Sequence, residues 1–188
     1  MAQAVHEVQG ISLPPAGTYR LDPTHTEIGF VARHMLTKVR GRFTEFEGTI
    51  EVAERPENSS VNVEVKTASV QTNAEQRDEH LRGADFFESE EYPVMTFRST
   101  GVRPTGDSSF ELDGELTIRD VTRPITLEGE FHGWGEDPFE NTKIFAEAKA
   151  TVVREDWDLT WNVAVETGGF LVSKKIDIVI DVEAARVG

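Results

Sequence analysis

The sequence predicts an all-β protein of about eight antiparallel strands, and three observations lead to this fold class. From Gly17 onward, apolar residues recur with a period of two, as they do along a strand that buries one face. Turn-forming stretches at 55–58, 104–107 and 133–138 separate these rows. The alternate positions of each row are polar, which is typical of an antiparallel sheet that faces water on one side.

The alternating rows place the strands along the chain. Ile28, Phe30 and His34 share one face of the first clear row. Because a large sheet must protect its edges, the strands either close into a barrel or form a two-sheet sandwich. Small residues that face inward leave space and favour a barrel with a ligand cavity; they are Gly114, Gly129, Ala146, Ala148 and Ala150. Strands are expected near residues 18–23, 27–34, 43–52, 61–67, 95–99, 110–118, 125–131, 144–152 and 176–182.

Residues 73–91 depart from this period. Asn73 and Gln76 fit a capping box, which predicts a short helix over residues 74–82 that stops at Gly83. The segment either covers one mouth of the barrel or is a packed connection between strands. Its apolar side chains are Leu81, Phe86 and Phe87.

The chain of 188 residues is long enough for one domain with a sizeable core. We assign residues 17–188 to the barrel and residues 1–16 to a flexible leader. Residues 1–10 lack the basic and apolar regions of a secretory signal, which predicts a cytoplasmic protein. No apolar run exceeds three residues, so we expect no membrane span.

Composition excludes several classes of function. The chain has 34 acidic and 19 basic residues, which give a net charge of −15. This negative charge argues against binding to nucleic acid or to an anionic membrane surface. There is no cysteine, so disulfides and thiolate chemistry are excluded. The five histidines show no chelating spacing, and no nucleophile elbow occurs. We therefore expect neither a metal nor another cofactor.

Five polar or aromatic side chains leave two interpretations open. His34 lies on an inward row, where it is either a hydrogen-bonded core histidine or the polar end of a cavity. Trp157 and Trp161 either plug the core or form cavity walls. Arg77 and Asp78 either form ion pairs that fix the helix to the barrel or present charge to a ligand head group, and for Asp78 we favour the structural role.

Several segments, taken together, resemble the YceI-like family. They are residues 19–30, 39–43, 73–87 with Tyr92 and Pro93, 114–125 and 171–183, of which 73–87 is the most specific. The resemblance extends in order over residues 17–186. It implies an eight-stranded antiparallel lipocalin-like barrel with a short helical insertion, in which family members hold a polyisoprenoid or a similar long-chain lipid.

The chain also departs from the family pattern. Asp120 stands where relatives often have glycine, and Trp157-Asp158 stand where they often have Phe-Gly. The second departure bears on the shape of the cavity near that bend. Many relatives are exported to the periplasm, whereas this sequence shows no signal.

From these observations we expect non-enzymatic binding and transport of a long-chain isoprenoid, either a polyprenyl chain or a quinone tail. The alternatives are an enzyme of isoprenoid or quinone metabolism and a barrel with a filled core. A homodimer is left open. The expected ligand-binding residues are Ile28, Phe30, His34, Phe43, Leu81, Phe86, Phe87, Phe97, Leu116, Ile118, Trp157, Trp161, Phe170, Ile176 and Ile178.

Overall fold

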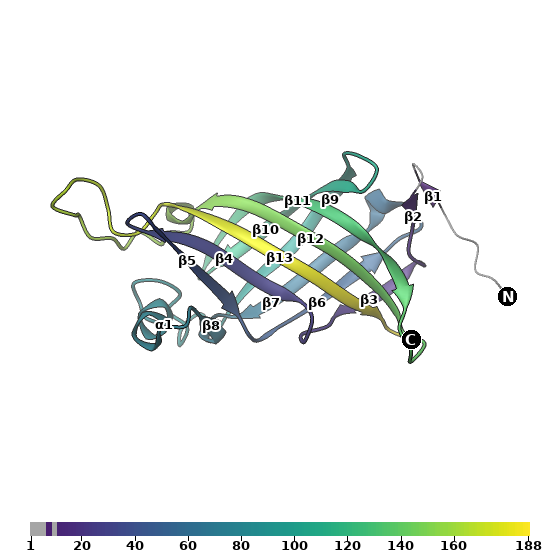
Figure 1. Ribbon diagram of the computed structural model, residues 1–188, viewed down its shortest axis with the longest axis horizontal. Helices are drawn as coiled ribbons and strands as arrows, with labels where there is room; N and C mark the ends of the chain where they lie inside the picture. The colour runs from purple at the N-terminus through teal and green to yellow at the C-terminus, as the bar shows by residue number, and fades with distance from the viewer. Residues whose placement is uncertain (1–6, 9–10) are drawn as a thin grey trace.

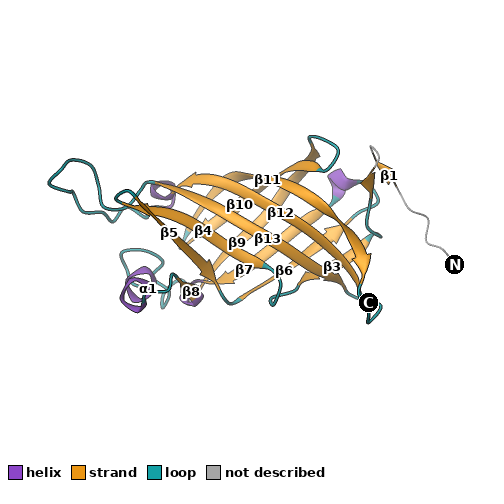
Figure 2. Cartoon of the chain, in the orientation of Figure 1, coloured by secondary structure: helices purple, strands orange, loops and turns teal. Residues whose placement is uncertain are grey.

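The structure, a computed structural model, describes residues 7–8 and 11–188 and consists mainly of one closed antiparallel sheet (Figures 1 and 2). The strands are β1 Glu7–Val8, β2 Ile11–Ser12, β3 Gly17–Leu21, β4 Glu27–His34, β5 Thr37–Phe43, β6 Phe46–Val52, β7 Ser60–Lys66, β8 Val70–Gln71, β9 Val94–Pro104, β10 Ser109–Ile118, β11 Val121–Glu136, β12 Thr142–Val153 and β13 Lys175–Arg186. The α-helix is α1 Glu75–Arg82; three 3-10 turns are η1 Pro56–Asn58, η2 Thr67–Ser69 and η3 Arg154–Trp157.

The described strands of the barrel occupy eight positions around it, which we call staves; some staves consist of two shorter strands that lie end to end. β3 and β4 lie end to end along β13, while β5 and β6 pair with β4 and β3 respectively. In the same way β7 pairs with β6 and the short β8 pairs with β5. The first three staves are therefore broken strands, and β9 to β13 are continuous. This confirms the eight-stranded antiparallel barrel with a short helical insertion.

The last strand closes the barrel. β13 pairs with β12 along one edge and with β3 and β4 along the other, so the sheet has no free edge there. Residues 22–26 interrupt the first stave, but Thr26 bridges the gap. Its hydroxyl donates to the Glu183 carbonyl at 2.8 Å and accepts from the Glu183 N–H at 3.1 Å. Closure excludes the two-sheet sandwich.

β5 was missed in the sequence, where a single strand was expected near 43–52. The structure breaks that region at residues 44–45 and begins a strand already at Thr37. Only Val39 and Phe43 are large apolar residues in the inward row of β5, so the hydrophobic period is weak. The outward row of β5 consists of Lys38, Arg40 and Arg42. These charged residues also recur at every second position, so the period of two is visible in the charges.

The inward glycines do not leave empty space, which corrects the prediction. A Cβ built on Gly114 would lie 2.4 Å from the Phe97 ring, and one on Gly129 would lie 2.2 Å from the Phe110 ring. The phenylalanine rings of neighbouring strands therefore lie directly over these glycines. They can do so only because glycine has no side chain. Ala146 and Ala148, in contrast, do line open space.

The predicted capping box is also wrong. The N-cap of α1 is Ala74 with no side-chain cap, because Asn73 has a left-handed backbone with φ 61° and precedes the cap. Gly83 ends the helix as expected, and its N–H donates to the His80 carbonyl at 3.1 Å. The residues that follow form turns. No helix among the described residues is long and apolar enough to cross a membrane.

Part of the N-terminal segment contacts the barrel. The Trp134 indole donates to the Ser12 hydroxyl at 3.1 Å, and the Tyr19 hydroxyl donates to the Pro15 carbonyl at 2.8 Å. β1 and β2 pair with each other and not with the barrel sheet. The boundary between a leader and the barrel at residue 17 stays a prediction.

The glycine packing yields a test of the barrel wall. Gly114→Ala should lower the free energy of unfolding by about 1–3 kcal/mol, because the new Cβ meets both the Phe97 ring and the Arg98 carbonyl oxygen, the latter at 2.7 Å. Gly101→Ala is the matched control, since a Cβ there meets nothing within 4 Å, and it should change stability by less than about 0.5 kcal/mol. Urea unfolding of both variants makes the comparison; equal midpoints would contradict the packing described.

Candidate ligand cavity

An apolar cavity of about 710 Å³ runs through the barrel. Its wall extends from His34, Arg77 and Trp161 at one end to Pro14 and Pro104 at the other. This volume is in the range of cavities that hold small ligands. The space argues against the filled-core alternative.

Fourteen of the fifteen residues expected to bind ligand line this cavity; they are Ile28, Phe30, His34, Phe43, Leu81, Phe86, Phe87, Phe97, Leu116, Ile118, Trp157, Trp161, Ile176 and Ile178. Phe170 does not. It is 57% exposed in the loop between η3 and β13, where it pairs with Ala164. The neighbours Leu171 and Val172 line the cavity instead. Contact of any of these residues with a ligand stays a prediction.

Some wall residues were not among the expected site residues. Val39 belongs to β5, which the sequence did not predict, and Phe131 and Val152 belong to the inward rows of the expected strands 125–131 and 144–152. The period-two pattern contains the signal for all three. It does not distinguish a side chain that faces empty space from one that faces another side chain.

Trp157 forms a fixed part of the wall. It is 2% exposed, and its indole N–H donates to the Leu116 carbonyl at 2.9 Å, across to β10. The next residue, Asp158, has a left-handed backbone with φ 59° and ψ 20°. Such a conformation suits glycine, so this chain keeps the bend with a residue that adopts it less readily.

The mouth near α1 is lined by aromatic and polar side chains. The His80 ring packs edge-on against Trp161 at 4.5 Å and against Phe86 at 5.1 Å between ring centres. Its Nε2 lies 2.8 Å from an Asp85 carboxylate oxygen. His34 is an exposed residue at the end of β4, on the rim of the same mouth. It is therefore not a core histidine.

The segment around α1 is packed and also forms part of the mouth. Phe87 meets Phe43 edge-on at 5.5 Å, and Leu81 packs against the same core cluster. Asp78 is buried and accepts from the Thr72 N–H at 2.8 Å and from its hydroxyl at 2.5 Å. Asp78 thus has the structural role that we favoured.

Arg77 also hydrogen-bonds to Thr72. Its Nε donates to the Thr72 hydroxyl at 2.7 Å, and a terminal nitrogen donates to the Thr72 carbonyl at 2.8 Å. Hydrogen bonds to Thr72 therefore take the place of the ion pairs expected between the helix and the barrel. The Arg77 side chain reaches the cavity wall.

A buried cation fixes the loop that borders this mouth. Arg154 is 4% exposed, and burial lowers the pKa of its guanidinium. The guanidinium donates to the Leu159 carbonyl at 2.6 Å and to the Ser173 carbonyl at 2.9 Å, at the two ends of the loop. Asn162 joins the two sides through Val172, donating at 2.7 Å and accepting at 3.0 Å. The base of the loop is therefore rigidly held.

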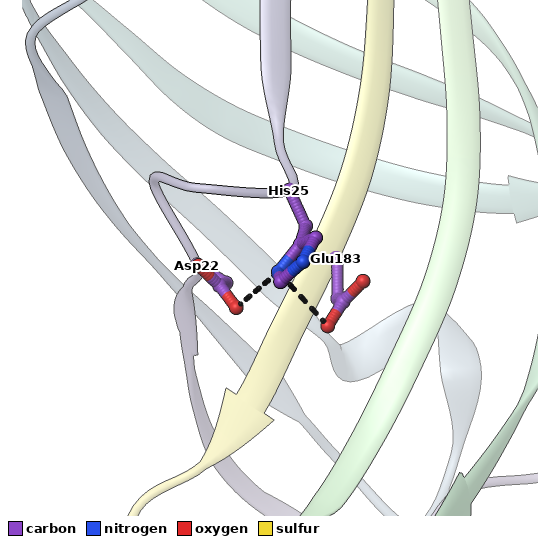
Figure 3. Close-up of side chains that lie close together, drawn as sticks. All are labelled: Asp22, His25 and Glu183. Atoms are coloured by element: carbon purple, nitrogen blue, oxygen red, sulfur yellow. Dashed lines mark hydrogen bonds and ion pairs between the residues drawn. The ribbon is translucent and has the colours of Figure 1, made fainter. Parts of the chain in front are cut away.

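A second polar cluster lies at the far end of the barrel, outside the cavity (Figure 3). Nδ1 of His25 lies 2.9 Å from Asp22 and 3.6 Å from Glu183. These three groups have the composition of a metal site, which local spacing in the sequence did not reveal. However, the Lys143 ammonium already lies 2.6 Å from Glu183 and 3.7 Å from Asp22. The side chain of Lys143 therefore already pairs with both carboxylates.

Because the hydrogen bond to Asp22 raises the pKa of His25, the cluster predicts a pH-dependent contribution to stability. That contribution is complete below the unfolded pKa of about 6.5 and is lost as the pH rises through the higher folded value. His25→Gln should therefore cost more stability near about pH 5.5 than near about pH 9. Urea unfolding of both proteins at the two pH values is the measurement. An equal cost at both would show that the ion pair does not contribute.

The lowered pKa of Asp22 does not interfere with this comparison. Its hydrogen bonds with His25 and Thr24 hold the pKa of this carboxyl well below its usual range. A lowered carboxyl pKa contributes stability above about pH 3.9, which lies below both measurements. The change between the two pH values therefore reports on His25.

Comparison with known proteins agrees with this architecture. The sequence profile of the YceI-like domain matches residues 19–184. Protein YceI of Escherichia coli O157:H7 is 35% identical over 175 residues, which are 91% of this chain and 88% of that protein. The UPF0312 protein of Azotobacter vinelandii is 33% identical over 164 residues, which are 86% of this chain and 82% of that protein.

Solved structures show the same fold. The Campylobacter jejuni YCEI protein superposes with a TM-score of 0.73 at 27% identity, over 83% of this chain and 90% of that one. A polyisoprenoid binding domain from Saccharophagus degradans, implicated in plant cell wall breakdown, gives 0.70 at 15% identity, over 92% and 100%. At that identity the second likeness concerns the fold alone. From the matched profile and the curated relatives, the chain belongs to the YceI-like family.

Proposed function

We propose that this protein binds a long-chain isoprenoid lipid, a polyprenyl chain or a quinone tail, inside its barrel and carries it unchanged. The observation that carries the proposal is the cavity of about 710 Å³, which is apolar along the barrel and has its polar groups at the ends. A ligand that fits has a long apolar body and one polar end. A polyisoprenoid-binding domain of the same fold supports the choice of lipid.

Burial of an apolar chain supplies the affinity in this proposal. Each methylene removed from water contributes about 0.8 kcal/mol, so a long chain needs no specific polar contact to bind tightly. The side chains that would contact it come from both halves of the barrel, among them Phe30, Phe97 and Leu116. Aromatic and branched side chains of this kind exclude water from the wall.

We place the polar head group of the lipid at the mouth beside α1. His34, His80 and Arg77 reach the cavity there and offer nitrogen atoms to a head group. At the other end, the apolar residues Leu13 and Pro14 would contact the end of the tail, although the polar residues Asp107, Ser108 and Ser109 line the same end.

The arrangement supports binding rather than an enzyme of isoprenoid or quinone metabolism. An enzyme needs a nucleophile or base positioned against the reacting bond. Among the described residues of the cavity wall, His80 is joined to Asp85 and lies between aromatic rings, with no serine or threonine hydroxyl bonded to it. Arg77 and Arg154 are engaged with protein oxygens.

The chemical identity of the ligand is tested by extracting the purified protein with organic solvent. Mass spectrometry should find an isoprenoid lipid, and a defined polyprenyl lipid added to the stripped protein should be recovered unaltered after incubation. A chemically modified lipid would favour the enzyme. Absence of retained lipid, both from the expression host and after loading, would contradict the proposal.

The position of the chain is tested by filling the cavity. Leu116→Trp and Ile118→Trp place a larger side chain on the inner wall and should reduce the amount of bound polyprenyl lipid several-fold. Both residues are 9% exposed, so circular dichroism must first show that each variant folds. Val179→Trp is the matched control, because Val179 is 45% exposed on the outer face. Unchanged loading in both cavity variants would place the lipid elsewhere.

A further inference from the structure

The charge of the molecule is unevenly distributed, although its net charge is −15. Residues 28–44, which form the β4–β5 hairpin, contain four of the 19 basic side chains and no acidic one. Arg33, Lys38, Arg40 and Arg42 all belong to the outward row of this hairpin, and all four are exposed. The hairpin is therefore a basic stripe on an acidic protein.

The stripe costs stability in the free protein. Arg33 and Lys38 lie directly opposite each other across the two strands, and like charges in this position are unfavourable. Within the described part of the chain, no carboxylate lies within ion-pair distance of Arg33, Lys38 or Arg40. An external anionic surface would relieve this repulsion.

The end of the barrel beside the stripe is apolar. Leu36 is 92% exposed and Met35 is 51% exposed, both in the turn between β4 and β5. In the neighbouring loop, residues 158–174, Phe170 is 57% exposed and Val163 is 48% exposed. Hence four large apolar side chains face water at one end of the barrel.

The hairpin and the loop form one structural unit. The Met35 N–H donates to the Leu171 carbonyl at 2.8 Å, and the Ser173 N–H donates to the Arg33 carbonyl at 2.9 Å. A bridge between His34 and Val172 adds to this pairing. Figure 1 shows the loop extending beyond the barrel end, past α1. We call Met35, Leu36, Val163 and Phe170, together with the basic stripe, the tip.

From these features we propose that the tip docks the protein on an anionic lipid bilayer. The exposed apolar side chains would enter the interfacial region, and the arginine and lysine side chains behind them would contact lipid phosphates, as in interfacial membrane anchors. This reverses the expectation from net charge alone, because the field near the membrane depends on charges within about 10 Å of it.

The tip also borders the mouth of the cavity. His34, Leu171 and Val172 belong both to the hydrogen-bonded unit and to the cavity wall. Docking through the tip would bring this mouth to the membrane surface, so that a lipid could move between bilayer and barrel. This use of docking rests on the proposed function, whereas docking itself does not.

The absence of cysteine allows a direct experiment. Leu36→Cys carries the only thiol and can be labelled with an environment-sensitive dye. Vesicles of phosphatidylcholine with phosphatidylglycerol should shift its emission to the blue, and pure phosphatidylcholine should not. Phe139→Cys is the matched control, because Phe139 is 83% exposed in the turn between β11 and β12 at the opposite end (Figure 1) and should show no shift.

Vesicle co-sedimentation measures the contribution of charge. Lys38→Gln and Arg40→Gln should each weaken binding to the mixed vesicles roughly fivefold, and added salt should weaken it further. Lys149→Gln, a change of equal charge at an exposed position in the middle of β12, should have almost no effect. Equal losses in all three variants would overturn the proposal.

Other outcomes also decide the matter. Absence of any shift at residue 36, or an equal shift at residue 139, would show that the tip is not the docking surface. A shift that depends on protein concentration and not on vesicles would assign the tip to a second copy of the chain. If the extracted protein contains isoprenoid but does not bind vesicles, only the docking proposal fails. If the protein binds vesicles but retains no lipid, only the proposed function is contradicted.

Discussion

Closure of the barrel by β13 is the constraint on which the rest of this structure depends. An apolar interior large enough for a ligand can exist only if the backbone groups around it are paired, because unpaired N–H and C=O groups cannot be buried cheaply. β13 pairs its backbone groups along both edges, although the neighbouring stave is broken between β3 and β4. The Thr26 hydroxyl takes the place of a backbone partner for Glu183 at the break.

The cavity results from how the wall is packed rather than from small residues alone. Where glycine faces inward, a neighbouring phenylalanine ring lies over it, as Phe97 does over Gly114. Trp157 is fixed by its hydrogen bond to β10, and the space that remains lies between such immobilised rings. Polar side chains are confined to the rims, so the middle of the barrel accommodates an apolar chain and the mouth beside α1 accommodates a polar group.

The same mouth connects the two proposals. Arg154 and Asn162 hold the base of the 158–174 loop, and the loop in turn is hydrogen-bonded to the β4–β5 hairpin. The tip, with its apolar side chains and basic flanks, is thereby placed beside the entrance of the cavity. The rest of the surface is acidic, which restricts the orientation in which the molecule can approach an anionic bilayer. Net charge describes neither the tip nor this orientation.

Alternation along the chain is enough to place the strands with a strong apolar period, such as 27–34 and 110–118, and fourteen of the residues that line the cavity. These features are local, since a side chain's face of a strand follows from its position alone. The family resemblance, and not the periodic pattern, predicted that the sheet closes. The tertiary structure was needed to show that Phe170 lies outside the cavity and that His25 meets Glu183 from the last strand. Each of these depends on contacts between residues far apart in the chain, which a periodic pattern does not encode.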